Sequence, residues 1–315
     1  MPRNDGFAYR ERLGPEGEDE ALLAYLCRRY RHSSVSEWTA RIASGQVLLD
    51  GKPTRPGAVL RCGQDVAWVR PPWDEPEAPL EFAVLYEDTD LLAVGKPAGL
   101  PTLPGANFLQ STLLHQVRRY APEATALHRL GRWTSGLCLF ARTRPARVEL
   151  ARQLRAREVG KRYRALAGGE PHWDAITVDR PIGPVPHRLL GSVHAAARDG
   201  KPAVSRVDVL ERRSTSFLCD VRIATGRPHQ IRIHLAAVGH PLVGDPLYVA
   251  GGVPAVATEA VPGDSGYLLH AAEATVRHPR TGREIVLTCT PPPVLRRWYD
   301  ASGEATLGEH ELADA

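Results

Sequence analysis

Many short strand-like runs with few helical segments between them limit the folds open to this chain. Beyond residue 80 such runs occur at 82–85, 91–94, 136–142, 161–169, 203–212, 216–225 and 283–289. Amphipathic helical patterns are found only at 111–120 and 146–160 before the polar segment that begins at residue 225. A doubly wound fold needs a helix between successive strands. The sequence therefore predicts an α+β domain over residues 81–300, with a mixed, mainly antiparallel sheet.

A proline-rich break precedes this domain. Residues 70–80 read RPPWDEPEAPL, with four prolines and three acids, so we expect a semi-rigid linker at 71–80. Residues 1–18 are polar and show no periodicity, which predicts a disordered tail. A second polar tail is expected at 301–315.

Residues 19–70 are expected to form a small separate module. Residues 21–31 have an amphipathic helical pattern, and Ser34 stands three residues before Glu37, which is typical of a capping box at the start of a second helix. An Asp50-Gly51 turn then separates two short β-prone runs. Because the module is edged with arginine, it suits nucleic-acid binding, but a basic-faced oligomerisation or packing module would look the same.

Composition limits the class of protein. The chain has 315 residues, a net charge of +4 and 43% hydrophobic residues, which fits one large domain and one small module. It has no apolar run of membrane-spanning length and no secretory signal, so we expect a cytoplasmic protein without membrane contact. The five cysteines have no metal-ligand spacing, so we expect reduced thiols and no metal site.

The basic residues are nearly all arginine. Lysine occurs only at positions 52, 96, 161 and 201 among 40 basic residues. The planar guanidinium group suits phosphate and carboxylate recognition. An arginine-rich genome would give the same bias, so composition leaves both explanations open.

The first polar cluster is HRLGRWTSGLCLFAR, residues 128–142. His128, Arg129, Arg132 and Trp133 lie around Gly131, and an apolar run follows Gly136. The pattern predicts a loop that carries a site with several donors. No acid accompanies them.

The second polar cluster is TGRPHQIRIHLAAVGHPLVGD, residues 225–245. We expect a helix with Pro228 as its first residue and an apolar stripe of Ile231, Leu235 and Val238. On that helix His229 and Arg232 would share a different face. Together with Arg227 and Gln230 they could hold a phosphate or carboxylate group, or they could form an ordinary solvated face.

Tyr163 lies between two arginines in the strand-like run at 161–169. A tyrosine there could pack against its neighbours with its hydroxyl at the surface. Stacking on a nucleobase is the alternative.

These segments together resemble the RluA-type RNA pseudouridine synthases. HRLGRWTSG is similar to that family's HRLDxxTSG signature, and TGRPHQIRIHLAAVGHPLVGDPLY is similar to its TGRxHQIRxHLAxxGxPxxGDxxY block. VLYEDTDLLAVGKPAGL, KRYRAL, GKPAVSRVDVL and LLHAAEATVRHPRTGRE resemble further family motifs, so the resemblance covers roughly residues 80–292. The N-terminal module is similar to the alpha-L RNA-binding motif.

The resemblance implies an enzyme that isomerises uridine to pseudouridine in structured RNA without a cofactor. The base must leave the stack to react. The expected partner is ribosomal or transfer RNA, and we expect a monomer. In the family, the Asp of HRLD is the catalytic carboxylate, the second Arg of TGRxHQIR pairs with it, and the Tyr packs on the target base; these positions correspond to Gly131, Arg232 and Tyr163. RNA contacts are expected at His128, Arg129, Arg132, Trp133, Arg227, His229 and Gln230.

Gly131 departs from the family pattern because glycine has no carboxylate. Another carboxylate, such as Asp245, could reach the pocket. Alternatively, groups of the RNA or a water could take part. In a third interpretation the chain is a noncatalytic RNA-binding or ribosome-assembly factor. Because Tyr163, Arg232 and most other motif positions are retained, we expect an RNA pseudouridine synthase.

Overall fold

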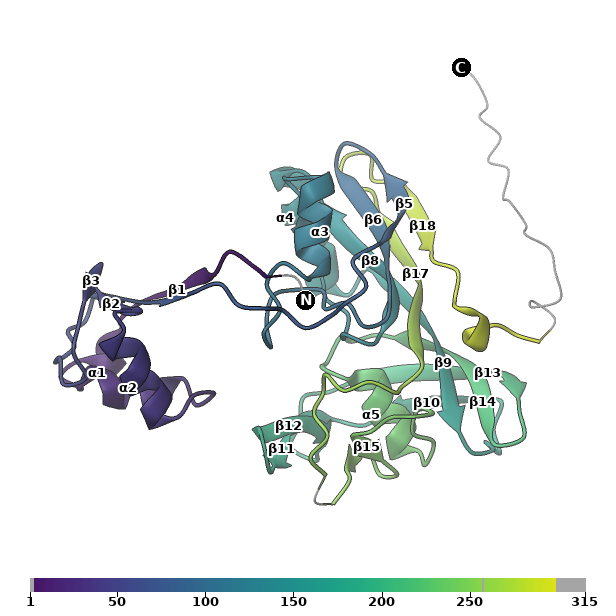
Figure 1. Ribbon diagram of the computed structural model, residues 1–315. Coiled ribbons are helices and arrows are strands. Elements are labelled where there is room, and N and C mark those ends of the chain that lie inside the picture. Colours follow the sequence, from purple (N-terminus) through teal and green to yellow (C-terminus); the bar gives the residue numbers. More distant parts are fainter. Residues whose placement is uncertain (1–2, 257, 299–315) are drawn as a thin grey trace. The chain divides into compact units, whose positions relative to one another are not determined.

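The computed structural model describes residues 3–256 and 258–298, and the predicted tail at 301–315 lies outside them. The chain divides into two compact units, residues 1–77 and residues 78–315. Figure 1 shows the elements of each unit. Among the described residues, no helix has both the length and the apolar character needed to cross a bilayer.

The first unit is a small sheet with two helices. Its elements are β1 (Phe7–Arg12), the 3-10 helix η1 (Pro15–Gly17), α1 (Leu22–Arg29), α2 (Val35–Ala43), β2 (Val47–Leu49), β3 (Lys52–Pro53) and β4 (Asp65–Arg70). The sheet order is β1-β4-β2-β3. The predicted capping box is confirmed, because Ser34 and Glu37 bond to each other's backbone N–H groups at the start of α2. The predicted turn at Asp50-Gly51 is confirmed as well, since both residues have positive φ between β2 and β3.

The predicted disordered tail at 1–18 is wrong for the described residues. Strand β1 pairs with β4 along its whole length, and the Tyr9 ring stacks on Trp68 with 5.2 Å between centroids. Leu13 belongs to the core of the unit and is 2% exposed. The polar composition of 1–18 hid an edge strand, whose stability comes from a partner more than fifty residues away.

The predicted linker is also partly wrong. Asn4 Nδ2 donates to Glu75 Oε1 at 2.8 Å, and the Trp73 N–H donates to Asn4 Oδ1 at 3.2 Å. Glu75 is fully buried. Residues 73–75 are therefore fixed to the first unit, and the division between units comes after Glu77.

The second unit is built on one large sheet. Its strands are β5 (Ala83–Glu87), β6 (Leu91–Lys96), β7 (Thr125–Ala126), β8 (Ser135–Ala141), β9 (Gly160–Gly168), β10 (Ala175–Asp179), β13 (Val204–Arg212), β14 (Ser216–Ile223), β17 (Leu269–Arg277) and β18 (Glu284–Thr288). The order is β10-β13-β14-β9-β17-β8-β6-β5, with β18 on β17 and β7 on β8. All pairs are antiparallel except β17 with β8. The predicted α+β fold with a mixed, mainly antiparallel sheet is confirmed.

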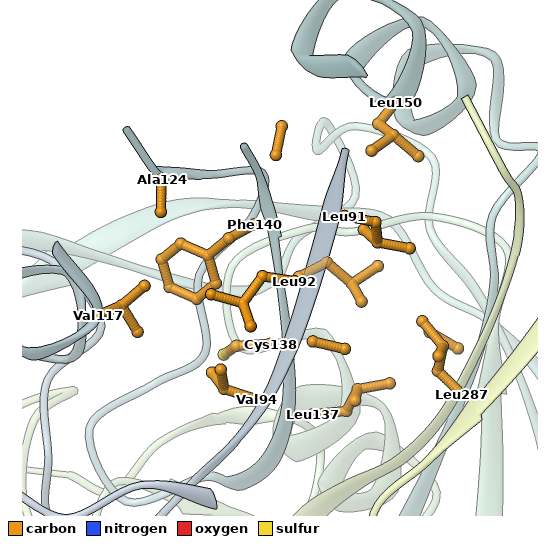
Figure 2. Close-up of a cluster of buried hydrophobic side chains, with 14 of the residues drawn as sticks. Leu91, Leu92, Val94, Val117, Ala124, Leu137, Cys138, Phe140, Leu150 and Leu287 are labelled. Atoms are coloured by element: carbon orange, nitrogen blue, oxygen red, sulfur yellow. The ribbon is translucent and has the colours of Figure 1, made fainter. Parts of the chain in front are cut away.

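Strands β6 and β8 form the centre of the larger core (Figure 2). Leu92 of β6 lies opposite Phe140 of β8 on the side where Val117 of α3 (Leu113–Tyr120) packs. Leu91 lies on the other side, with Leu150 of α4 (Arg144–Ala156). Both strands are buried on two faces, which explains their continuous apolar sequences.

The remaining elements cover the other end of the sheet. They are hairpin β11 (Ile182–His187) and β12 (Gly191–Ala196), helix α5 (Gln230–Ala237), hairpin β15 (Tyr248–Val249) and β16 (Val253–Pro254), and the 3-10 helix η2 (Pro293–Leu295). The prediction that Pro228 begins the helix is wrong. His229 caps α5 in a left-handed conformation with φ of 54°, which places Pro228 in the preceding turn. The solvated face is also wrong, because seven of the eight residues of α5, Gln230 to Ala236, are buried.

Candidate active site

The loop before β8 is held by the GKPAG segment. The Lys96 ammonium is 2% exposed and donates to the carbonyl oxygens of Pro97, Leu100 and Arg132 at 2.8, 2.7 and 2.9 Å. Arg132 Nε in turn donates to the Gly99 carbonyl at 3.0 Å. Burial lowers the pKa of Lys96 to about 8. Lys96 thus fixes the backbone directly after Gly131 to the GKPAG segment.

Gly131 is exposed, and a hydroxyl group lies where a side chain would begin. A Cβ at this position would meet Tyr267 Oη at 2.8 Å and Thr134 Oγ1 at 3.4 Å. Tyr267 is 4% exposed, and its Oη lies 3.4 Å from Thr134 Oγ1. The space of the missing carboxylate is therefore partly filled by a phenol.

Arg232 is buried and has an acid partner. Its Nε and Nη2 donate to the two carboxylate oxygens of Asp245 at 2.7 and 2.8 Å, and Nη1 donates to the Pro262 carbonyl at 3.1 Å. The side chains are 2% and 0% exposed. Burial alone would lower the pKa of Arg232, but the hydrogen bonds and charge of Asp245 outweigh it and raise this pKa.

Tyr267 connects Gly131 with the ion pair of Arg232 and Asp245. The central carbon of the Arg232 guanidinium lies 4.1 Å from the Tyr267 ring centroid and 5.0 Å from that of Tyr248. Gly131 thus lies beside the Tyr267 hydroxyl and Arg232 against the Tyr267 ring, so both belong to one site. We predicted a grip for a phosphate or carboxylate group, and at Arg232 a carboxylate of the protein fills it, because Asp245 occupies the fork of the guanidinium.

Tyr163 lies in the middle of β9, half-buried where the two main core clusters meet. Its neighbours across the sheet are Val221 and Ala271. Burial raises the pKa of its hydroxyl. Among the described residues the hydroxyl has no hydrogen-bond partner, so the ring packs while its polar end stays available.

Two predicted RNA contacts are structural. Gln230 is 3% exposed; its Oε1 accepts from Thr225 Oγ1 and the Arg227 N–H, and its Nε2 donates to Val204 O and Ser205 Oγ. His128 Nε2 accepts from the Leu139 N–H at 3.1 Å. Burial and, secondarily, the charge of Lys161 lower the pKa of His128 to about 4, so the ring is neutral. Both side chains therefore have a structural role, and their contact with RNA stays a prediction.

His229 is a third neutral ring. Its Nδ1 lies 2.7 Å from Tyr248 Oη, and burial, followed by the charge of Arg232, lowers its pKa to about 3. Its left-handed backbone starts α5. His229 therefore holds Tyr248 against Arg232, and its contact with RNA stays a prediction.

The other predicted contacts keep part of their surface. Arg129 is exposed, and Arg227 is half-buried with Nε donating to the Pro202 carbonyl at 3.1 Å. Trp133 Nε1 donates to the Gly263 carbonyl at 2.9 Å, and Arg132 packs on the rings of Phe108 and Trp133. Trp133 thus ties the Gly131 loop to the segment before Tyr267. These four residues remain candidates for RNA contact.

The residue that sequence reasoning missed is Tyr267. It lies in SGYLLHAA, just before β17, far from both polar clusters. Only the parallel pairing of β17 with β8, which places His270 opposite Ser135, brings it beside Gly131. No local pattern carries that information.

Comparisons with known proteins agree with this fold. Residues 90–237 match the family model for RNA pseudouridylate synthase. An uncharacterised RNA pseudouridine synthase of Synechocystis is 43% identical over 87% of this chain and 95% of that protein. The ribosomal large subunit pseudouridine synthase D of Neisseria meningitidis serogroup B is 36% identical over 85% of this chain and 74% of that protein.

A solved structure shares the architecture. Human RNA pseudouridylate synthase domain containing 1 has a TM-score of 0.53 and 26% identity, covering 70% of this chain and 87% of that one. The expected family and function are therefore confirmed. This chain belongs to the RluA-type RNA pseudouridine synthases, isomerases that convert uridine to pseudouridine in RNA.

Proposed function

We propose that this protein isomerises a uridine of ribosomal RNA in a pocket formed by Gly131, Tyr163, Arg232 and Tyr267. The similarity to a ribosomal large subunit pseudouridine synthase supports the substrate class. The observation that carries the site is the Tyr267 hydroxyl, 2.8 Å from the position of a Cβ on Gly131. A base extruded from structured RNA would lie against Tyr163.

The Tyr267 hydroxyl takes the place of the missing carboxylate. Tyrosine is known as a nucleophile at sugar carbons, and no side chain at position 131 covers this hydroxyl. The Arg232 cation against its ring favours negative charge developing on the oxygen.

The reaction balances without a cofactor. Tyr267 Oη bonds to C1′ of the uridine, the C1′–N1 bond breaks, and the hydroxyl proton passes to the detached uracil. The uracil turns, its C5 bonds to C1′, and the bond from C1′ to the tyrosine oxygen breaks. The proton of C5 returns to that oxygen, so the phenol is regenerated.

Asp245 is unsuited to this role. Its Oδ2 accepts from Arg232 Nε, while Oδ1 accepts from Arg232 Nη2 and from the N–H groups of Leu247 and Tyr248. The carboxylate is fully buried. A carboxylate with four donors is a poor nucleophile because attack would cost those hydrogen bonds.

The test is uridine isomerisation by hydroxyl variants, measured by carbodiimide labelling of large-subunit ribosomal RNA and of transfer RNA. Tyr267→Phe should reduce turnover at least about a hundredfold. Tyr248→Phe is the matched control, because it removes a hydroxyl beside the same guanidinium but away from Gly131. Equal turnover by wild type and Tyr267→Phe would refute the role of the hydroxyl.

Restoring the acid separates turnover from mere binding. Gly131→Asp alone should be poorly active, because its Cβ meets the Tyr267 hydroxyl. Gly131→Asp combined with Tyr267→Phe removes that contact and supplies a carboxylate. If only the double variant were active, the natural protein would be a noncatalytic RNA-binding factor, the function that Gly131 alone favours.

For the first unit, an RNA-binding role of the alpha-L type is supported by its aromatic and cationic surface. Phe7 and Tyr9 are exposed, and the guanidinium of Arg41 lies 4.2 Å from the Trp68 ring centroid. Exposed rings stack on unpaired bases. Tyr9→Ala should weaken RNA binding without changing the rate for bound substrate; an unchanged affinity would favour the oligomerisation or packing role.

A further inference from the structure

A second cavity lies beside the proposed pocket. It has a volume of about 230 Å³ and is lined by residues at the end of α4 and the start of β9 (Leu154, Arg155, Arg157, Val159 and Lys161) and by residues 223–227, from the last residue of β14 onward. Four cations line it: Arg155, Arg157, Lys161 and Arg227. None of its lining residues is acidic. The cavity therefore has an excess of positive charge.

None of the four cations has an ion-pair partner among the described residues, and the Arg227 guanidinium donates only to the Pro202 carbonyl. Arg155, Arg157 and Lys161 make no salt bridge with any residue of the described ranges 3–256 and 258–298, whereas Arg152 on the same helix pairs with Glu149 and Glu158 at 2.9 and 2.8 Å. Burial lowers the pKa of Lys161, and no carboxylate acts in the other direction. Removing an ammonium group from water costs free energy unless an anion pairs with it.

The helix dipole does not account for the whole cluster. Arg155 and Arg157 are at the C-terminal end of α4, where cations are favourable. Lys161 and Arg227, however, belong to a strand and to a turn of another segment. Their convergence on one cavity therefore requires another explanation.

Arg157 occupies a backbone position that suits glycine. It caps α4 with φ of 61° and ψ of 29°. A left-handed residue other than glycine costs about 1–2 kcal/mol. Glycine would be more stable at this position, so the stability of the helix cap does not account for an exposed arginine there.

The cavity adjoins the uridine pocket. Lys161 and Tyr163 lie on the same face of β9, two residues or about 7 Å apart. A Cβ on Gly226 would lie 3.9 Å from Lys161 Nζ, and the charge of Lys161 acts on His128. The distance between these cations and the Tyr163 ring, which is expected to face the base, is thus about the spacing of neighbouring nucleotides.

We propose that this cavity binds a backbone phosphodiester of the RNA, next to the uridine that packs on Tyr163. This rests on the proposed function, because it takes RNA as the substrate. The volume is smaller than the roughly 300–1,000 Å³ of typical small-molecule sites, so the cavity suits a phosphate group rather than a whole nucleoside. Guanidinium forks bind phosphate oxygens in pairs.

The experiment compares pocket variants with a charge-matched control. Arg157→Gln and Lys161→Gln remove one cation each from the cavity, and Arg152→Gln removes one from the same helix outside it. The affinity for an in vitro transcript of large-subunit ribosomal RNA is measured over a range of potassium chloride concentrations. Each pocket variant should lower the slope of log K against log salt by about one and raise Kd on the order of tenfold.

Arg152→Gln should leave both quantities unchanged, since two carboxylates already neutralise that guanidinium. Lys161→Arg should keep the wild-type slope, which guards against a folding defect in Lys161→Gln. Wild-type slopes in both Gln variants, or an equal loss in Arg152→Gln, would overturn the proposal. Binding of inorganic phosphate that depends on Lys161, without any change in RNA affinity, would overturn the assignment to the RNA backbone.

The outcome is independent of turnover. A reduced slope in a protein that does not isomerise uridine would uphold the phosphate site and refute the proposed catalysis. An unchanged slope in an active enzyme would do the reverse.

Discussion

The two faces of β9 differ in whether their cations have carboxylate partners. On one face, Arg162 contacts Asp220 at 3.0 Å and Glu273 at 2.6 Å, and Arg164 contacts Asp220 at 2.7 Å. On the other face Lys161, next to Tyr163, has no carboxylate partner among the described residues. On one face of the strand the cations form ion pairs within the fold, and on the other face Lys161 could bind an anion from outside the protein.

This contrast resolves an ambiguity in the composition. An abundance of arginine is compatible with both genome bias and RNA binding, because a count does not reveal partners. Arg162 and Arg164 are neutralised within the fold, as is Arg232 by Asp245. The informative cations are those that the fold leaves without an acid, and four of them line one cavity.

The largest effect is expected from the buried pair of the active site. Asp245→Ala leaves the Arg232 guanidinium uncompensated and should lower the free energy of unfolding by about 3–5 kcal/mol. Denaturant unfolding followed by tryptophan fluorescence measures this. Asp174→Ala is the control, because its side chain is 90% exposed in its pair with Arg212 and should change stability by less than about 1 kcal/mol. Similar losses in the two variants would contradict this distinction.

A smaller loss is expected on the paired face of β9. Asp220→Asn weakens hydrogen bonds to Arg162 and Arg164 and should cost about 1–3 kcal/mol. RNA affinity should stay at the wild-type value, since that face is not in the binding surface. A change in the salt dependence of RNA binding would break the comparison between the two faces.

The pH dependence of stability tests the unpaired face of β9, because the charge of Lys161 affects the pKa of His128. The pKa of His128 is about 4 in the folded protein and about 6.5 when unfolded. The unfolded chain therefore binds more protons between these values, so the contribution of His128 to stability is complete above pH 6.5 and is lost as pH falls toward 4. Lys161→Gln should raise the pKa of His128 in an NMR titration, because a positive charge is removed; a lower or unchanged value would contradict the proximity of the two groups.

The smallest effect has the opposite sign. Arg157→Gly places glycine at a left-handed helix cap and should raise the free energy of unfolding by about 1 kcal/mol. The same variant should bind RNA more weakly. A gain in stability together with wild-type affinity would mean that the arginine has no role in binding.

Features set by neighbours in sequence were predictable. The capping box of Ser34 and Glu37 and the turn at Asp50-Gly51 depend on a few adjacent residues. Strands β6 and β8 could be predicted because burial on both faces demands continuous apolar runs. The family resemblance placed Tyr163, Gly131 and Arg232 in one site, and the structure joins the last two through Tyr267.

Features that depend on distant partners were not predictable. The order of residues 3–13 comes from β4, and the acid that pairs with Arg232 lies beyond the end of α5. His128 and Gln230 have side chains typical of RNA contacts, but the backbone groups they satisfy belong to other strands and loops. Periodicity shows which face a residue occupies, not what lies opposite.

The contact between position 131 and Tyr267 has a consequence for how these two positions can evolve. Aspartate at 131 and the hydroxyl at 267 compete for one volume, so the fitness of either depends on the other. A change at one of the two positions alone should therefore be less favourable than a change at both. Sequences with aspartate at 131 should therefore lack tyrosine at 267, and the two positions should change together along the tree.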